Sequence, residues 1–563
     1  MRRHRTFILM FSVLSVYSLL GVYLAYCQII RGPQLTAQAV DMRSQRIELQ
    51  EWARGEILDR NLFPLTGSES SLAIYCLTSR LKPDGGSDEC GKLASILAPI
   101  LGRKEAELEQ QLAQAREQNT GWVRLAQNLD EQQQARINSL NDPALITVPI
   151  NKRYRDDGFC AHIIGYLGGG ENPGGVSGIE KAYDELLRRD PPQAQLVAVH
   201  DARGAAISGL MYKIRREQQD EKSAVVLTID SGVQTLAEEA MNRWVKKGAV
   251  VVMDIHSKEI LAMASRPTFD PYRAVANREP DSPLMNRALS LYYPGSLFKI
   301  LTTCAALEEG ITDTGEEFTC SGKYLMPDGF SFSCLRKAGH GRLTMAQAFA
   351  VSCNPVFIEL GSRLGRNRLI DYVAKMHLAD VSITGYPGQT ASEININPGL
   401  RALANASLGQ QGIRLTPVQL CSLLATIADD GSWSPPRLLS CTVDSRGEKH
   451  YPQEATREQV ISPQTARTVQ SLLEKVVREG TGSSAAFPEA QVAGKTGTSQ
   501  TGALKENEQE ILDTWFGGYF PAQNPRWAIV VMVEEGESGA VSAAPAFKEI
   551  AQGMVNSLGT RTN

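Results

Sequence analysis

The sequence lacks most of the features that mark metalloproteins and nucleic-acid-binding proteins. None of its ten cysteines forms a C-x-x-C pair, and its seven histidines show no metal-ligand spacing. The formal net charge is only −4 over 563 residues, so there is no basic field of the kind that nucleic acid requires. We therefore expect no metal site, no cofactor and no nucleic-acid partner.

Charge is also absent from one long stretch near the N-terminus. A basic cluster at 2–5 is followed by residues 6–30, which carry no charged side chain. As a helix rising about 1.5 Å per residue, this stretch exceeds the ~30 Å hydrocarbon core of a bilayer. A cleaved signal peptide is the alternative, but its apolar region spans only about 7–15 residues and ends at a small-residue site. We predict a cytoplasmic tail over 1–5 and a retained transmembrane helix over 6–30, with the chain after Arg31 outside by the positive-inside rule.

The cysteines would then lie on the oxidising side of the membrane. We expect most of them to be buried, free and inert thiols. Cys320 and Cys334 differ because they flank a short loop containing Pro327-Asp328-Gly329. A disulfide there would close a loop of roughly 15 residues and contribute about 3 kcal/mol in the chain-entropy model. Pairing cannot be deduced from sequence alone, so two free thiols are the alternative.

The pattern of apolar and polar residues changes near Arg216. Before it lies a mixed region with polar, helix-favouring stretches at 108–119 and 129–140. After it, apolar strands alternate with helical patterns, one of which begins at Ser231, a plausible helix cap. Strands at both ends with helices between them predict an α+β domain, in which one antiparallel sheet is covered by helices. The expected strands are 224–228, 248–255, 259–265, 515–520 and 527–533, and the expected helices are 231–247 and 544–558.

Three short motifs follow one another in this second region. They are S-x-x-K at Ser296-Leu297-Phe298-Lys299, S-x-N at Ser352-Cys353-Asn354, and K-T-G at Lys495-Thr496-Gly497, which Thr498 follows. The same trio occurs in β-lactamases and penicillin-binding proteins.

Each motif taken alone is weak, because the chain holds a second S-x-x-K at 79–82 and a second S-x-N at 139–141. Ser79 is followed by Pro83-Asp84-Gly85-Gly86, so no helix can continue from it. Ser296 instead follows Tyr293-Pro294-Gly295 and precedes a largely apolar stretch. We therefore place Ser296 in the first turn of a helix.

This arrangement suits acyl transfer through a serine. A serine hydroxyl needs an adjacent base, and Lys299 lies on the same helical face as Ser296. Lys299 can act as that base if burial or a neighbouring cation lowers its pKa, and Lys495 can be the cation. Ser352 can bridge the two lysines and pass a proton to the leaving amine. Asn354 can hold the substrate's amide and help orient Lys299.

The third motif offers the remaining groups. Backbone N–H groups of Ser296 and Thr498 would form an oxyanion hole, whose donors are commonly worth ~10²–10³ in rate. Thr496, Gly497 and Thr498 form the predicted substrate-binding segment, with the two threonine hydroxyls and Lys495 on a terminal carboxylate.

Around these residues the chain resembles the class B penicillin-binding proteins, which are single-pass, monofunctional peptidoglycan transpeptidases. Residues 54–61, RGEILDRN, resemble the family's N-terminal signature, although Leu62 stands where a glycine is usual. Residues 158–187 resemble its second pedestal signature. We interpret the departures as affecting packing more than chemistry. Further matches are Asn286-Arg287-Ala288, His340-Gly341, Gly412, Thr416-Pro417 and Gln419, and further departures are Leu297 for a threonine and Gln410 for a glycine.

The resemblance implies an elongated pedestal or dimerisation domain over 31–216 and a serine β-lactamase-like transpeptidase domain over 217–563. Ser296 would attack the D-Ala-D-Ala end of a peptidoglycan stem peptide, release D-alanine and pass the acyl group to the amine of a neighbouring stem. D,D-carboxypeptidase activity is the implied side reaction, and β-lactams are the implied covalent inhibitors. A SEDS-family glycosyltransferase is the implied partner, and the division or sporulation type of monoderm bacteria is most similar.

Three other functions are weighed against this one. A serine β-lactamase needs a second base to activate deacylating water, and no such residue can be identified. A β-lactam sensor should carry several transmembrane segments and a cytoplasmic effector. A non-catalytic division scaffold should have lost motif residues, whereas all three motifs are intact.

Overall fold

The computed structural model describes residues 2–558, apart from 33, 36–43, 50–53, 68, 79–80, 82–88, 119–121, 143, 169–172, 189–193, 200–212, 217–222, 275–280, 380–382, 387–391 and 505–507. The chain forms two compact units. The first comprises Met1–Arg54, Ser71–Ile150 and Arg189–Asp220, and the second comprises Gly55–Ser70, Asn151–Arg188 and Glu221–Asn563. The second unit thus includes two segments that precede the expected boundary at 216–217, and the domain bounds stay a prediction.

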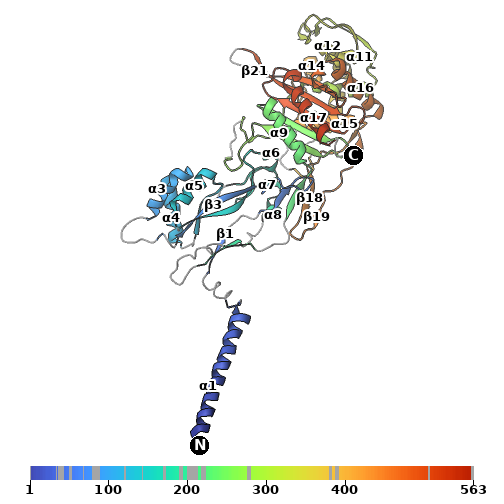
Figure 1. The fold of residues 1–563 in the computed structure, drawn as a ribbon. Coiled ribbons are helices and arrows are strands. Elements are labelled where there is room, and N and C mark those ends of the chain that lie inside the picture. Colours follow the sequence, from blue (N-terminus) through green and yellow to red (C-terminus); the bar gives the residue numbers. More distant parts are fainter. Residues whose placement is uncertain are drawn as a thin grey trace. The chain divides into compact units, whose positions relative to one another are not determined.

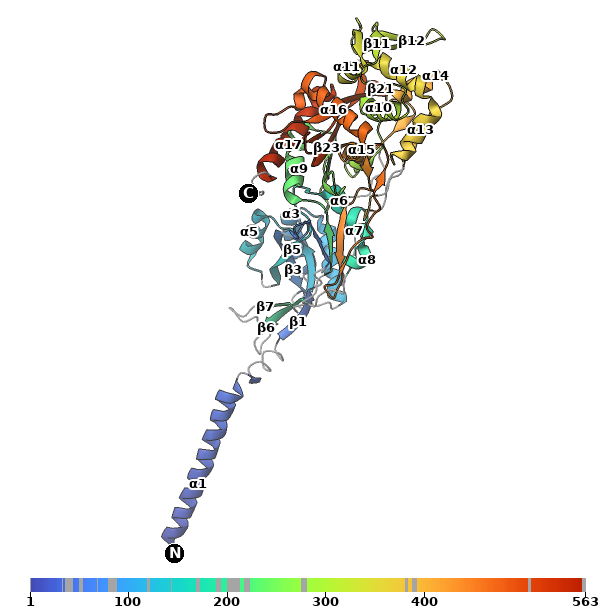
Figure 2. The same cartoon turned by 90° about the vertical axis from the view of Figure 1, so that its right-hand side faces the viewer.

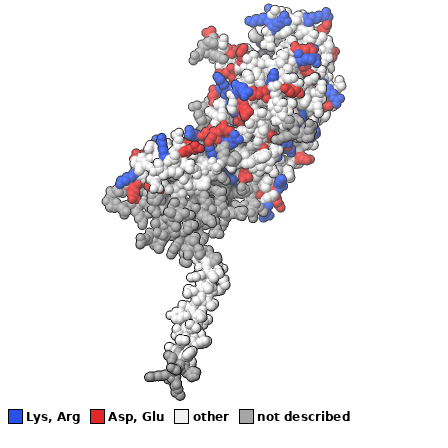
Figure 3. Space-filling view, viewed as in Figure 1, with Lys and Arg blue, Asp and Glu red and all other residues white. Residues whose placement is uncertain are grey.

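The N-terminal helix matches the predicted transmembrane segment. Helix α1 (Arg2–Ala25) continues into the π-helical turn η1 (Tyr26–Ile30). Within the described residues, Phe7–Ile30 is the one helical stretch long and apolar enough to cross a membrane, with a mean hydropathy of 2.1. Figure 3 shows no lysine, arginine, aspartate or glutamate on the visible face of its described part. This helix is compatible with a single-pass membrane protein, and its orientation stays a prediction.

A three-stranded sheet with strand order β4-β3-β5 organises the first unit. Alternating side chains of β3 bury both faces of this sheet: Ile74 and Cys76 pack with the helices, whereas Ala73, Tyr75 and Leu77 pack against Trp122 and β5. A second sheet of this unit has the order β1-β6-β7. The elements are β1 (Ser44–Leu49), β3 (Glu69–Leu77), α3 (Glu89–Leu101), α4 (Glu105–Glu117), β4 (Trp122–Ala126), α5 (Glu131–Leu140), β5 (Leu145–Lys152), β6 (Ala194–Val199) and β7 (Lys213–Arg216).

The second unit is built on the predicted antiparallel sheet, with strand order β10-β9-β23-β22-β21. Its strands are β9 (Gly248–Asp254), β10 (Ile260–Arg266), β21 (Ala493–Leu504), β22 (Glu510–Phe520) and β23 (Trp527–Val533). Side chains of β9 alternate between two cores, because Val250 and Val252 belong to one cluster while Val251 and Met253 belong to the other. Both faces of the sheet are therefore buried, as its apolar strands require.

Helices cover the two faces of this sheet. Helices α9 (Ser231–Trp244) and α17 (Ala544–Leu558), some 300 residues apart in the chain, lie side by side on one face (Figures 1 and 2). The other face carries the central helices, including α15, whose residues pack on β9 and β23. The central helices are α10 (Lys299–Glu308), α11 (Met345–Ala350), α12 (Asn354–Leu364), α13 (Arg366–Lys375), α14 (Leu400–Ser407), α15 (Pro417–Ala428) and α16 (Pro463–Glu479).

The segment resembling the family's N-terminal signature forms strand β2 (Glu56–Leu58) and the turn after it. Strand β2 pairs in parallel with β8 (Ala224–Leu227). Buried Asp59 accepts backbone hydrogen bonds that close the turn, in which Leu62 takes a φ of 64°. This left-handed conformation explains why glycine is usual there. Asp59 also accepts the hydroxyl of Ser231 at 2.6 Å, so the predicted cap at Ser231 is wrong, and Asp230 caps α9 instead.

The remaining elements of the second unit are short. They are α6 (Ala161–Ile164), α7 (Gly178–Ala182), α8 (Asp184–Leu187), η3 (Arg287–Leu289), η4 (Gly295–Leu297), β11 (Glu317–Cys320), β12 (Lys323–Leu325), β13 (Ser331–Ser333), β14 (Gly341–Thr344), β15 (Glu393–Ile394), β16 (Ile413–Arg414), β17 (Ser432–Trp433), β18 (Leu439–Val443), β19 (Lys449–His450), β20 (Glu458–Gln459), η5 (Ser483–Ala485) and η6 (Gly539–Ala543).

Candidate active site

Ser296 lies in the 3₁₀ turn η4, which leads directly into α10. The residue before it, Gly295, has a φ of 53°, and a Cβ atom there would lie 2.5 Å from the carbonyl oxygen of Thr498. Gly295 also donates its backbone N–H to Gly409 at 2.8 Å. Only glycine allows both the left-handed backbone and this close approach. The turn therefore holds Ser296 against strand β21, at the start of a helix as expected.

Ser352 connects the first two motifs. Its hydroxyl donates a 3.0 Å hydrogen bond to Ser296 Oγ. Ser352 is buried between α11 and α12 and has a φ of 56°. A positive φ in a residue other than glycine is sparsely populated and persists where the surrounding structure imposes it. The fold thus fixes a strained turn at the position where the second motif meets Ser296.

Lys299 is anchored by the second motif. Its buried Nζ donates to Ser352 O at 2.9 Å, to Ser352 Oγ at 3.1 Å and to Asn354 Oδ1 at 2.7 Å. Burial lowers the pKa of Lys299 to about 7, and the nearby thiols of Cys353 and Cys334 oppose that shift only in part. A substantial fraction of this amine is therefore neutral near neutral pH and able to accept a proton.

Lys495 is the second buried lysine of the site. It lies on β21, where burial and then the repulsion of Lys299 place its pKa well below the ordinary value. Its Nζ lies 5.3 Å from the centre of the Phe349 ring and has no hydrogen-bond partner among the described residues. An unpartnered buried ammonium is costly, so this position favours an incoming anion.

The threonines of the third motif have partners that no motif in the sequence indicates. The hydroxyls of Thr496 and Thr481 lie 2.8 Å apart in a hydrogen bond. Gln410 donates Nε2 to Thr498 O at 3.4 Å and accepts the backbone N–H of Gln500 at 3.2 Å. The amide of Gln410 thus bridges the backbone of Thr498 and Gln500, and the interpretation that this departure affects packing more than chemistry stays a prediction. No spacing pattern points to Thr481.

Of the two second copies of the motifs, the structure describes only the S-x-N sequence. Ser79 and Lys82 lie outside the described residues. Ser139 lies in α5 of the first unit, where its hydroxyl donates to Arg136 O, and Asn141 ends that helix with a φ of 46°. This S-x-N sequence is a helix end.

The cysteines are largely as expected, since all ten are free and nine of them are buried. Cys320 and Cys334 are free thiols in the structure, and their sulfurs share a cluster with Cys353 and His340. The disulfide between Cys320 and Cys334 stays a prediction.

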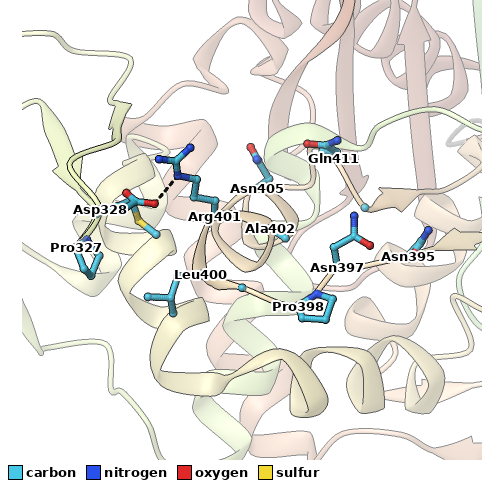
Figure 4. A pocket seen from close by; sticks show the side chains of 13 residues that line it. Pro327, Asp328, Asn395, Asn397, Pro398, Leu400, Arg401, Ala402, Asn405 and Gln411 are labelled. Atoms are coloured by element: carbon cyan, nitrogen blue, oxygen red, sulfur yellow. Dashed lines mark hydrogen bonds and ion pairs between the residues drawn. The ribbon is translucent and has the colours of Figure 1, made fainter.

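A pocket of about 600 Å³ lies between α14 and the β12–β13 hairpin (Figure 4). Four carboxamides line it, and Arg401 binds Asp328 at 2.6 Å on its wall. Gln411 on its rim directly follows Gln410, which contacts the third motif. The pocket is thus a polar space next to the site, separate from the three motifs. The carboxamides belong to Asn395, Asn397, Asn405 and Gln411.

Comparison with known proteins agrees with this geometry. Residues 248–552 match the family model of the penicillin-binding protein transpeptidase domain, and residues 50–208 match that of the penicillin-binding protein dimerisation domain. Stage V sporulation protein D of Bacillus subtilis is 28% identical to this chain. The match covers 100% of this chain and 86% of the length of that protein.

Two solved structures are also similar. The D,D-transpeptidase domain of a peptidoglycan glycosyltransferase from Eggerthella lenta is 30% identical with a TM-score of 0.58, covering 74% of this chain and 94% of its own. The apo form of penicillin-binding protein 3 from Mycobacterium tuberculosis is 25% identical with a TM-score of 0.61. The match covers 92% of this chain and 97% of that protein's chain.

Proposed function

The chain belongs to the class B penicillin-binding proteins, and we propose that it cross-links peptidoglycan through an acyl-enzyme on Ser296. The observation that carries these residue roles is the hydrogen-bonded chain from Lys299 through Ser352 to Ser296, beside a buried Lys495 with no hydrogen-bond partner in the described structure. A base, a nucleophile and an anion site are thus assembled from all three motifs.

Acylation follows from these contacts. When Lys299 is neutral, both hydrogen bonds reverse: Ser296 donates its proton to Ser352 Oγ, and the Ser352 proton moves to the amine of Lys299. Ser296 Oγ then attacks the carbonyl of the penultimate D-alanine. The backbone N–H groups of Ser296 and Thr498 stabilise the oxyanion. The bond to the terminal D-alanine then breaks, and its amine takes a proton back from the Lys299–Ser352 pair. An amine of a second stem peptide then attacks the ester and gives its proton to the Lys299–Ser352 pair. The bond between the acyl carbon and Ser296 Oγ breaks, and Ser296 takes up that proton as the cross-link forms.

The terminal carboxylate of the donor peptide can serve as the partner that Lys495 of the third motif lacks among the described residues. It would accept hydrogen bonds from the Thr496 and Thr498 hydroxyls and pair with Lys495, whose Nζ has no partner in the described residues. A β-lactam presents a strained amide beside a carboxylate and so binds in the same way. Its opened ring stays attached to Ser296, obstructs the incoming amine and leaves a long-lived acyl-enzyme.

The reaction is tested with a soluble stem pentapeptide ending in D-Ala-D-Ala and a stem-peptide amine as acceptor. The full chain should release D-alanine and form the cross-linked product, and Ser296→Ala should do neither. Ser139→Ala, in the second S-x-N sequence, is the matched control and should retain activity. Full activity of Ser296→Ala would contradict the assignment of Ser296 as the nucleophile.

We also propose that the chain is anchored by residues 6–30 with its N-terminus in the cytoplasm and its catalytic unit outside. The basic cluster at 2–5 and the apolar Phe7–Ile30 helix support this orientation. Protease added to intact spheroplasts should remove the chain after Arg31, and protection of that part would reverse the assignment.

A SEDS-family glycosyltransferase is the proposed partner, and cell division or sporulation is the proposed setting. The match to a penicillin-binding protein dimerisation domain over 50–208 and the similarity to a stage V sporulation protein support this proposal. Crosslinking from the native membrane should recover such a glycosyltransferase, and a fluorescent fusion should localise to a septum. Uniform labelling of the cell envelope, with no glycosyltransferase recovered, would contradict both.

A further inference from the structure

Four potential metal ligands meet beside the second motif. Cys320, Cys334, His340 and Cys353 each offer one donor atom, and these atoms all lie within 4.8 Å of one another. The three cysteines are buried and the histidine is half-buried. They come from the end of β11, the residue after β13, the residue before β14 and the residue before α12. Four short segments within residues 320–353 thus bring three sulfurs and an imidazole to one point.

The two distances from Cys334 fit a shared ion better than a disulfide between Cys334 and Cys353. Cys334 Sγ lies 3.5 Å from His340 Nδ1 and 4.0 Å from Cys353 Sγ. A tetrahedral zinc ion with Zn–S of about 2.3 Å and Zn–N of about 2.0–2.1 Å separates its ligands by ~3.6 Å for sulfur and nitrogen and ~3.8 Å for two sulfurs. A disulfide requires about 2.05 Å between sulfurs. The measured distances lie close to the tetrahedral values.

The backbone arranges the ligands before any ion binds. Strands β11 and β14 pair Cys320 with Gly341, which brings Cys320 next to His340. Gly339 has a φ of 80°, and a Cβ atom there would lie 2.3 Å from the carbonyl oxygen of Cys320. This close packing holds two of the four ligands together, as a preformed metal site requires.

The surrounding segment lacks an extensive core of its own. Residues 317–344 form two sheets of only two short strands each, β11–β14 and β12–β13. Phe318, Met326 and Leu343 are buried in the main core of the second unit, whereas Leu325, Phe330 and Leu335 are exposed. Small structures of this kind are commonly stabilised by a bound metal or a disulfide.

We propose that Cys320, Cys334, His340 and Cys353 bind one structural zinc ion. Each thiol would release its proton to solvent and bind as a thiolate, and the imidazole would bind neutral, leaving a net charge of −1 on the complex. Four protein ligands close the coordination sphere, which is typical of structural rather than catalytic zinc. Since Cys353 stands between Ser352 and Asn354, the ion would hold the S-x-N turn in place. The site does not depend on the role of Ser296.

The test measures metal in the full-length chain purified in detergent without chelators. Inductively coupled plasma mass spectrometry should find one zinc per chain, and a strong chelator should release it. Replacement by Co²⁺ should give the sulfur-to-cobalt charge-transfer band of a thiolate-rich tetrahedral site. Cys320→Ser and Cys334→Ser should each lose most of the zinc. Cys441→Ser, at a buried cysteine of β18 outside the cluster, is the matched control and should keep it.

Two results would overturn the site. One is wild-type protein without zinc that takes up neither added Zn²⁺ nor Co²⁺, whether its thiols are free or joined in a disulfide such as Cys320–Cys334. The other is folded Cys334→Ser protein that keeps the full metal content and an unchanged Co²⁺ spectrum. If the variants do not fold, the wild-type stoichiometry and Co²⁺ spectrum still decide. Labelling by fluorescent penicillin, measured on the same samples, reports separately on Ser296, and Ser296→Ala should retain its zinc.

Discussion

Ser352 Oγ donates a 3.0 Å hydrogen bond to Ser296 Oγ and accepts one from Lys299 Nζ at 3.1 Å. No direct hydrogen bond joins Lys299 to Ser296 in the part of the chain that the structure describes. The proposed base therefore reaches the proposed nucleophile through a second hydroxyl, that of Ser352. Ser352 lies in the turn after α11, where its backbone has a positive φ. The geometry makes Ser352 the first candidate for the proton relay.

Ser352→Ala removes this relay while leaving Lys299 and Ser296 in place. We expect acylation by a β-lactam to slow by ~10²–10⁴, the usual range for general acid–base catalysis. Stopped-flow acylation by nitrocefin measures the rate, and a thermal unfolding curve checks the fold. Ser139→Ala is the matched control. A Ser352→Ala rate within a few-fold of the wild type would mean that Lys299 reaches Ser296 without it.

The pH dependence of acylation should report on Lys299. The amine can accept a proton only when neutral, and its pKa is lowered by burial to about 7. The second-order acylation rate should therefore rise with pH through about 7 and level off above it. Rate constants measured with nitrocefin across a pH series test this. A profile that is flat through neutrality, or one that rises only near the ordinary lysine pKa of 10.5, would contradict the assignment of the base.

Lys495→Met should raise the stability of the fold and slow acylation. The buried Nζ has no partner within the described structure, and an unsatisfied buried polar group costs about 1–3 kcal/mol. An apolar side chain of similar length should therefore raise the free energy of unfolding by about that amount, measured by denaturant titration. The same change should weaken β-lactam acylation by ~10-fold or more, because charge-assisted hydrogen bonds contribute about 1.5–3 kcal/mol. Lower stability together with unchanged acylation would show that Lys495 has a structural role instead.

Gly295→Ala tests the approach of the serine turn to β21. The added Cβ atom would lie 2.5 Å from Thr498 O, so the turn must move and the acylation rate should fall along with stability. Gly310→Ala is the matched control, because Gly310 has a φ of 63° but nothing within 4 Å of the added atom. It should cost about 1–2 kcal/mol from the left-handed backbone alone and leave acylation intact. Equal effects of the two changes on acylation would show that the approach of Gly295 to Thr498 does not control the acylation rate.

The sheet and its outer helices could be predicted from sequence because hydrophobic alternation and helical spacing are local. The expected strand 527–533 and helix 544–558 coincide with β23 and α17. The cap of α9 was misassigned to Ser231 because the hydroxyl of that residue binds Asp59, which lies 172 residues away. Contacts over such distances leave no periodic signal in the chain.

In the site, too, the local motifs could be predicted from the sequence and the contacts between distant segments could not. Motif spacing places Ser296, Lys299, Ser352 and Lys495 in the sequence, and the structure brings them into one site. The bridging amide of Gln410 could not be predicted, since it depends on how two distant loops meet. The cluster around Cys353 could not be predicted for a similar reason, because its members are spread from 320 to 353 without paired spacing.

The most direct test of the account is mass spectrometry of the penicillin adduct. After incubation of the full chain with penicillin and proteolysis, the mass of the intact opened β-lactam should be found on the peptide containing Ser296. The adduct should persist on the minutes scale, and Ser296→Ala should carry none. Attachment to any other residue, or loss of the adduct within seconds, would contradict the assignment of Ser296 as the nucleophile of a transpeptidase.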